Sequence, residues 1–204
     1  MRLRLVIVLV MLPFMATAQT LPERPFRDGK LVSKAGPPVT LEPGKAFHYA
    51  GGQVIDIFKV AGAEQHFFVE VAPDSAIRRF YWVQFEHYYP DNSHQYDFTG
   101  IKQQPVRLGL LDFMGDVTVA PGYFTSGNRA GSDSEAGAQF LRARGYKLDG
   151  TFVRLRLFHL PDSSRRKELM IIYGETLPSG VSEEALKSVI IQRAQENLKV
   201  QLAL

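Results

Sequence analysis

The sequence predicts a single α+β domain, in which a mostly antiparallel, twisted sheet carries a C-terminal helix across one face and one further short helix. Two observations lead to this fold class. Runs of β-branched and aromatic residues alternate with Gly, Pro, Asn and Asp turn signals through most of the chain. The connections between these runs are short, whereas neighbouring parallel strands need a crossover of about a dozen residues or more.

Residues 1–18 have the pattern of a secretory signal peptide. Two arginines give a positive start, the apolar stretch 5–15 follows, and the Ala-Thr-Ala sequence at 16–18 is a pattern that signal peptidase accepts. The apolar stretch is well short of the roughly 20 residues needed to span a bilayer. We therefore expect cleavage before Gln19, export to the periplasm or the extracellular space, and no stable membrane span after cleavage.

Composition and charge narrow the classes of function. The chain has 24 Lys and Arg against 21 Asp and Glu, and it has no cysteine. The near balance of charge, without a dense basic block, predicts no nucleic-acid partner. Without cysteine the chain has no disulfide, no thiolate metal site and no cysteine nucleophile. The sequence has no phosphate-binding glycine loop, nucleophile elbow or zinc-protease motif, so we predict no cofactor and assign no catalytic residue.

Residues 19–44 form a Pro/Gly-rich segment ahead of the domain. Five prolines and three glycines interrupt this segment. Proline removes a backbone donor and restricts the residue before it, which disfavours a helix or a central strand. We expect an extended arm over 19–44, followed by a single α+β domain over 45–204.

Seven strands are expected within the domain. Each candidate is rich in β-branched or aromatic residues and is bounded by turn residues such as the Pro-Asp-Asn sequence at 90–92. The expected strands are 54–60, 67–71, 78–89, 106–113, 117–119, 151–160 and 168–173.

Capping residues locate two helices. Ser132 and Glu135 have the spacing of a capping box, and Gly145 suits the left-handed position just past the end of a helix. Ser182 is a good N-cap for the second helix. An apolar stripe follows it, which needs the sheet as a surface to cover. The stripe consists of Ala185, Leu186, Val189, Ile190, Ala194 and Leu198.

The strand at 78–89 holds the densest group of candidate site residues. Side chains alternate along a strand, so Trp82, Gln84, Glu86 and Tyr88 share one face. This face mixes large rings with an amide and a carboxylate, which is typical of a pocket with apolar area and a few polar anchors. The alternative is a polar-aromatic outer face that the N-terminal arm contacts.

A second polar set predicts an anion site or an ion-pair ladder. Arg154 and Arg156 leave the same side of their strand and, if the strands are neighbours in register, form a charge-balanced cluster with Glu70 and Glu86. An arginine pair can bind a carboxylate or phosphate of a ligand. The balanced charge favours the other interpretation, cross-strand ion pairs worth well under about 1 kcal/mol each when exposed.

Two further groups are weaker candidates. Ligand-type residues gather between 87 and 97, but their spacing matches no compact zinc signature, so we predict no metal site. They are His87, Asp91, His94 and Asp97. Asp112 and Asp116 could face each other across a turn as paired carboxylates, although a tight acidic turn is the commoner outcome.

Three functions remain open, and whether the chain is an enzyme remains open with them. The leading hypothesis is an exported, non-catalytic binding domain for an amphiphilic small molecule or peptide. The ligand would contact Trp82, Gln84, Glu86 and Tyr88, with Arg154 or Arg156 nearby. One alternative is a cofactor-free hydrolase that uses carboxylates near Glu86 or Asp112. The other is an envelope protein that docks onto a protein partner through its arm and a sheet edge.

Overall fold

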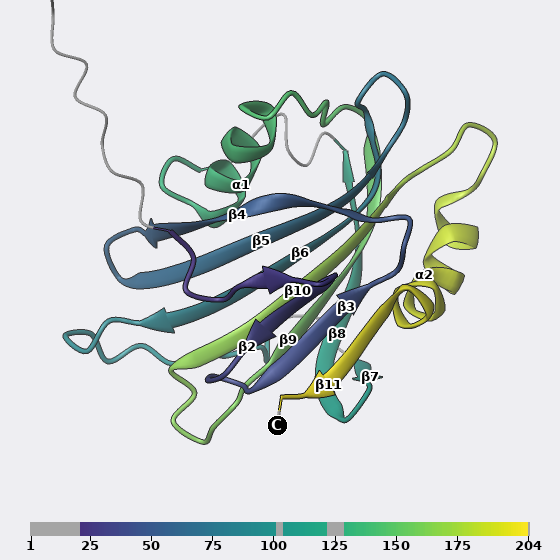
Figure 1. Ribbon diagram of the computed structural model, residues 1–204. Coiled ribbons are helices and arrows are strands. Elements are labelled where there is room, and N and C mark those ends of the chain that lie inside the picture. The colour runs from purple at the N-terminus through teal and green to yellow at the C-terminus, as the bar shows by residue number, and fades with distance from the viewer. Residues whose placement is uncertain (1–20, 101–103, 122–128, 204) are drawn as a thin grey trace, which may run out of the picture.

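The computed structural model describes residues 21–100, 104–121 and 129–203 (Figure 1). The predicted signal peptide lies outside these residues. The described chain forms one compact unit of two sheets and two helices, and all the strand pairings within the sheets are antiparallel. The predicted fold class is therefore confirmed. Neither described helix is long and apolar enough to cross a bilayer.

The larger sheet has seven strands and the smaller has four. In spatial order the large sheet contains β4 (His48–Ile57), β5 (Ala61–Val71), β6 (Ile77–Tyr88), β10 (Lys167–Thr176), β9 (Thr151–His159), β8 (Leu111–Pro121) and β7 (Gln104–Leu108). The small sheet contains β1 (Phe26–Arg27), β2 (Lys30–Ser33), β3 (Val39–Pro43) and β11 (Leu198–Leu202).

Two meanders meet at the centre of the large sheet. Strands β4, β5 and β6 follow one another across it, and strands β7 to β10 return from its far edge toward β6. The β6–β10 pair runs from His87 opposite Lys167 to Arg79 opposite Glu175. Residues far apart in the sequence thus lie side by side at this junction.

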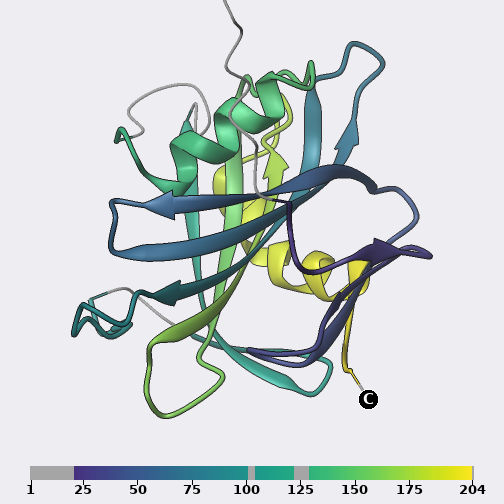
Figure 2. The same cartoon turned by 60° about the vertical axis from the view of Figure 1, so that its left-hand side comes forward.

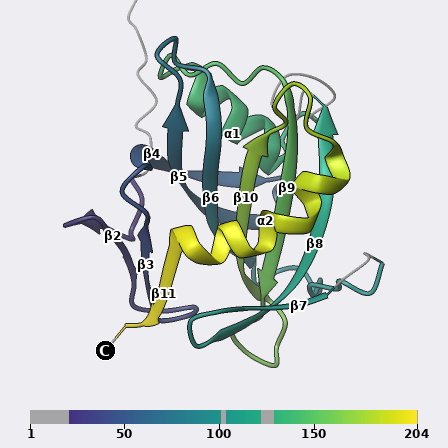
Figure 3. The same ribbon diagram turned by 90° about the vertical axis from the view of Figure 1, so that its right-hand side faces the viewer.

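The C-terminal helix α2 (Glu183–Asn197) packs across one face of the large sheet, as predicted (Figure 3). The Ser182 hydroxyl caps it by accepting a hydrogen bond from the Ala185 amide at 3.2 Å. Its buried residues are Leu186, Ile190 and Ala194, all from the predicted stripe.

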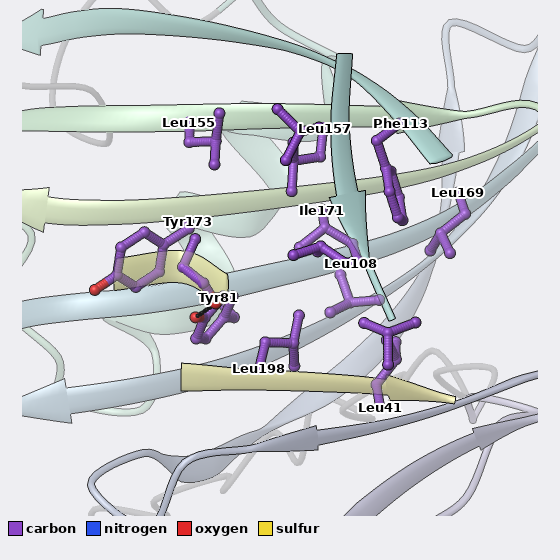
Figure 4. Close-up of a cluster of buried hydrophobic side chains, with 14 of the residues drawn as sticks. Leu41, Tyr81, Leu108, Phe113, Leu155, Leu157, Leu169, Ile171, Tyr173 and Leu198 are labelled. Carbon is purple, nitrogen blue, oxygen red and sulfur yellow. Dashed lines mark hydrogen bonds between the residues drawn. The ribbon is translucent and has the colours of Figure 1, made fainter. Parts of the chain in front are cut away.

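The main apolar core lies between this face of the large sheet, α2 and the small sheet, which Figure 2 shows beside α2. The buried Tyr81 hydroxyl donates to the Ala194 carbonyl of α2 at 2.8 Å, so this polar group has a hydrogen-bond partner inside the core. Figure 4 shows side chains from both sheets gathered in it, among them Leu41, Leu108, Leu155, Leu157, Ile171, Tyr173 and Leu198.

The shorter helix α1 (Asp133–Arg142) covers the opposite face. The Ser132 hydroxyl accepts from the Glu135 amide at 3.2 Å, as the predicted cap requires, while the Glu135 carboxylate accepts from the Gly131 amide at 2.7 Å. Gly137 allows a close approach to the sheet, because a Cβ there would lie 3.1 Å from the Phe67 ring. A second apolar core, which includes Trp82, lies between this helix and the sheet.

Strand β11 was not predicted. The apolar stripe places Leu198 in the helix, but its φ of −137° is extended and the chain continues along β3. Leu198 and Val200 are buried in the main core. Both are buried because alternate residues of a strand point to the same side. The apolar pattern therefore continues beyond the end of the helix.

The predicted arm is extended and provides β1, β2 and β3. The expectation that it contains no central strand is wrong for β3, which lies between β2 and β11. Val39 and Leu41 alternate into the core, while Pro38 precedes the strand and Pro43 is its last residue. The prolines therefore flank the ladder and leave its central donors intact.

The expected strands at 106–113 and 117–119 are also revised. A turn at Gly109, whose φ is +58°, divides the first into β7 and β8, and the second is part of β8. Asp112 and Asp116 consequently lie on one strand and do not face each other across a turn. Asp116 pairs with Arg156, whereas the Asp112 side chain is 84% exposed.

Candidate functional site

The four predicted residues of β6 lie along the face that α1 covers. Trp82 and Gln84 are fully buried there, and Glu86 and Tyr88 are partly exposed. The carbonyl of Asp133, at the start of α1, accepts a hydrogen bond from Gln65 beside them. A ligand could reach Trp82 or Gln84 only if α1 moved away from the sheet.

A row of three glutamines satisfies the polar groups on this face. Gln53, Gln65 and Gln84 lie directly opposite one another on β4, β5 and β6. Gln53 Nε2 donates to Gln65 Oε1 at 2.8 Å, and Gln65 Nε2 donates to Gln84 Oε1 at 2.9 Å. Gln84 Nε2 then donates to Glu86 Oε2 at 2.6 Å. The row gives the Gln84 amide buried partners within the protein, so this amide does not need a ligand.

Glu86 also faces a second carboxyl group. Tyr96 donates to its other oxygen at 2.8 Å, and Glu168 lies directly opposite it on β10. Glu168 is only 5% exposed, and its Oε1 has no hydrogen-bond partner in the described chain. Burial raises the pKa of Glu168 well above its ordinary value, and the charges of Glu86 and Asp133 add to this. The neutral form of this acid is therefore favoured.

The predicted cluster of arginines and glutamates does not form as one group. Arg156 pairs with Asp116, and Arg154 donates from Nε to the Thr118 hydroxyl at 2.8 Å. Glu70 pairs with Arg79 on the opposite face, because it projects to the same side as Tyr81. Strand β10 also separates β6 from β9, so neither arginine is a direct cross-strand neighbour of Glu86.

The ligand-type residues between 87 and 97 make other contacts. The His94 ring lies against Tyr88, and the Asp97 carboxylate accepts from the Thr99 amide. Within the described part of the chain, no three His, Asp or Glu side chains gather so that they could hold a metal ion.

Residues 23–36, here called the strap, are anchored on the other face of the large sheet. Figure 1 shows these N-terminal strands in front of the sheet. The Arg24 backbone amide and guanidinium each donate to Glu64 at 2.8 Å. The chain of hydrogen bonds continues from Glu64 to His66 and from His66 to Tyr49, at 2.7 and 2.9 Å.

This anchor determines the charge state of Glu64. Burial alone would raise the pKa of the Glu64 carboxyl group, but hydrogen bonds from His66 and Arg24 outweigh burial and lower it to about 2. The carboxylate therefore stays ionised at neutral pH, and the strap is held by a charge-assisted pair.

A pocket of about 370 Å³, here called the strap pocket, lies between the strap and β4–β6. Its lining is mixed, and within it the guanidinium of Arg24 lies 3.9 Å from the centre of the Phe85 ring. The apolar lining consists of Ala35, Gly36, Val54, Ile55, Gly62, Ala63 and Phe85. The polar lining consists of Glu23, Arg24, Glu64, Glu86, His87, Tyr89 and Lys167. Of the six predicted ligand-binding residues, only Glu86 belongs to it.

A second pocket, of about 480 Å³, lies at the ends of β7, β8 and β9. Its lining is mainly apolar and includes Phe98, Phe113 and Phe158, together with the charged residues Asp112 and Arg107. None of the six predicted residues lines it.

Sequence reasoning missed both the glutamine row and the strap anchor. The row had only a partial signal: Gln84 lies in the predicted strand 78–89, whereas Gln53 and Gln65 lie just before the predicted strands 54–60 and 67–71. The anchor had a weaker one, the single carboxylate Glu64 inside the otherwise uncharged stretch 60–69. Comparison of the chain with protein-family models, with curated proteins and with solved structures finds no match.

Proposed function

We propose that this chain is an exported, non-catalytic binding domain, and that an amphiphilic small molecule or peptide occupies its strap pocket. The observation that carries the proposal is the pocket itself, whose lining combines apolar residues with charged and polar side chains. Small-molecule sites usually have this composition, and about 370 Å³ is near the lower end of their size range.

The strap pocket is a better candidate than the Trp82 face. The amides of Gln65 and Gln84 already have partners, and α1 covers the indole of Trp82. A ligand on this face was expected because the buried polar side chains needed hydrogen-bond partners. The glutamine row provides those partners instead. Glu86 is among the lining residues of the strap pocket, but its carboxylate lies on the α1 face, where both oxygens accept hydrogen bonds from neighbours.

The hydrolase alternative receives less support. Glu86 and Glu168 are cross-strand partners on the α1 face, but none of the described pockets is lined by Glu168. General acid–base catalysis requires the group to be within hydrogen-bond reach of the substrate. Asp112 is highly exposed and lies beside Arg107 at 3.8 Å, which is typical of a surface ion pair.

Native mass spectrometry of the protein, purified gently from its own compartment, tests the proposal. We expect a co-purifying small molecule that is lost when Ala35→Trp fills the pocket. Ala35 is exposed, and only its backbone carbonyl takes part in the anchor, so the substitution should leave the fold intact. Ala46→Trp, at an exposed position outside the pocket, is the matched control. Equal retention of the molecule by both variants would contradict the proposed site.

Export rests on the leader-like pattern of residues 1–18. N-terminal sequencing of protein recovered from the periplasm or medium should begin at Gln19. Recovery of the chain only from the cytoplasm, beginning at Met1, would contradict this part of the proposal.

A further inference from the structure

Lys167 and His87 form an unpartnered pair of donors at the strap pocket. They lie directly opposite each other on β10 and β6, where cross-strand side chains on one face are neighbours. Both side chains are exposed and both line the pocket. Within the described residues, neither the Lys167 ammonium nor the His87 imidazole forms a hydrogen bond or a close ion pair; Lys167 interacts at longer range with the exposed Asp162 carboxylate, and the His87 ring contacts the ring of Tyr89.

Most other charges around the pocket are already neutralised. Arg24 is paired with Glu64, and Glu86 directs its carboxylate to the α1 face, where both oxygens accept hydrogen bonds. Glu23 is an exposed acid on the strap. Its carboxylate adds a negative charge at the edge, which disfavours a ligand carrying two negative charges.

The electrostatic environment of His87 supports a positive potential at this point. Burial lowers the pKa of His87, and the charges of Lys167 and Arg24 lower it further, while Glu23 opposes them with a smaller effect. An imidazole that stays neutral can still donate one hydrogen bond. Together with the ammonium, it offers two donors and about one positive charge.

Apolar surface begins directly beside these donors. Phe85 precedes His87 by two positions and therefore projects from the same face of β6. The strap passes over the aliphatic part of Lys167, since a Cβ at Gly36 would lie 3.7 Å from Lys167 Cδ. A hydrocarbon chain could thus pass between the strap and the sheet while its head group stays at the donors.

We propose that the strap pocket takes an amphiphile with a single carboxylate, bound between Lys167 Nζ and the His87 ring, with its hydrocarbon on Val54 and Phe85. This assignment rests on the binding function proposed above and specifies the chemical class of its ligand. Two oxygens and one negative charge match the two donors and the single free ammonium.

Isothermal titration of the full chain with three ligands of equal chain length tests the assignment: decanoate, decanol and decyltrimethylammonium. We expect decanoate to bind at least about tenfold more tightly than decanol, the change expected for a charge-assisted hydrogen bond. Decyltrimethylammonium should bind more weakly than decanol. Lys167→Gln should abolish the preference for decanoate while decanol binding persists. Lys45→Gln, at an exposed position outside the pocket, should keep the preference.

An NMR titration of the His87 ring provides a second readout. Decanoate should raise the pKa of His87, because an adjacent anion stabilises the imidazolium, whereas decanol should not. Binding of decanol or of the ammonium compound as tightly as decanoate would overturn the carboxylate assignment and leave the binding function standing. If none of the three compounds binds, the carboxylate assignment is also wrong. If native mass spectrometry detects no co-purifying molecule, the proposed binding function itself is wrong.

Discussion

Arg24 and Glu64 are joined through both the backbone and the side chain of the arginine. The two hydrogen bonds, each 2.8 Å long, connect the strap to β5, the second strand from one edge of the large sheet, across forty positions of the sequence. The Glu64 side chain is 6% exposed and the Arg24 side chain 20%, so the pair is largely removed from water. This connection holds the strap against the large sheet together with the packing of Phe26 on Tyr49 and Phe68.

Replacing Glu64 by glutamine should destabilise the protein. The change removes the negative charge that Arg24 faces and turns one acceptor into a donor. Breaking a buried charged pair usually costs about 3–5 kcal/mol, and the partial exposure of Arg24 places our expectation at about 2–3 kcal/mol. Denaturant unfolding measures the difference. Glu42→Gln, which alters exposed pairs with Lys30 and Lys199, should cost less than about 0.5 kcal/mol. Equal losses would contradict a special role for the anchor.

The same carboxylate should make part of the stability depend on acid pH. The pKa of Glu64 is about 2 in the folded chain and 4.5 ordinarily. A lowered folded pKa contributes stability that is present above pH 4.5 and is lost as the pH falls toward 2. The contribution is on the order of 3 kcal/mol at neutral pH. Unfolding curves between about pH 2 and 7 should therefore bring wild type and Glu64→Gln together in acid. A constant difference across this range would argue against the lowered pKa.

Glu168 should produce the opposite pH dependence. Its pKa is raised by burial, so its contribution to stability is fully present below pH 4.5 and is lost as the pH rises through the folded pKa. Glu168→Gln keeps the neutral shape and removes the titration. We expect this variant to be more stable than wild type at pH 8, with no advantage near pH 4. The exposed substitution Glu184→Gln provides the control, and destabilisation by Glu168→Gln at pH 8 would contradict the expectation.

Local signals predicted the fold where one short segment decides the outcome. Ser132 and Ser182 cap the two helices as predicted, because capping depends on residues three positions apart. Strand β11 depends instead on a distant partner, β3, so the apolar side chains of Leu198 and Val200 could not by themselves distinguish a strand from a longer helix.

The candidate site was harder to predict because it depends on register between strands. Alternation correctly separated Trp82 from Tyr81, yet it could not show that Gln53 and Gln65 stand opposite Gln84. It also could not bring Arg24, in a proline-rich segment, to Glu64. The polar face of β6 was predicted correctly. The hydrogen-bond partners of its side chains lie on β4 and β5, however, and without them the face resembled a ligand site.

The glutamine row should behave as one energetic unit, and Gln65 is its central member. Gln65→Met leaves two buried groups without their partner, Gln53 Nε2 and Gln84 Oε1, and removes the hydrogen bond to the part-buried Asp133 carbonyl. Each unsatisfied group costs about 1–3 kcal/mol, so we expect a loss of about 2–4 kcal/mol after local relaxation.

A double-mutant cycle distinguishes a coupled row from three independent contacts. Adding Gln53→Met to Gln65→Met removes one of the stranded amides, and replacing both partners of a buried hydrogen bond by apolar groups can be nearly neutral. The double variant should therefore be less destabilised than the sum of the two single variants, by about 1 kcal/mol or more. Denaturant unfolding of the four proteins measures this coupling, and Gln201→Met, at an exposed position, serves as the control. Strict additivity would mean that the neighbouring amides find water or other partners, and that the face beneath α1 is open enough to be reconsidered as a binding surface.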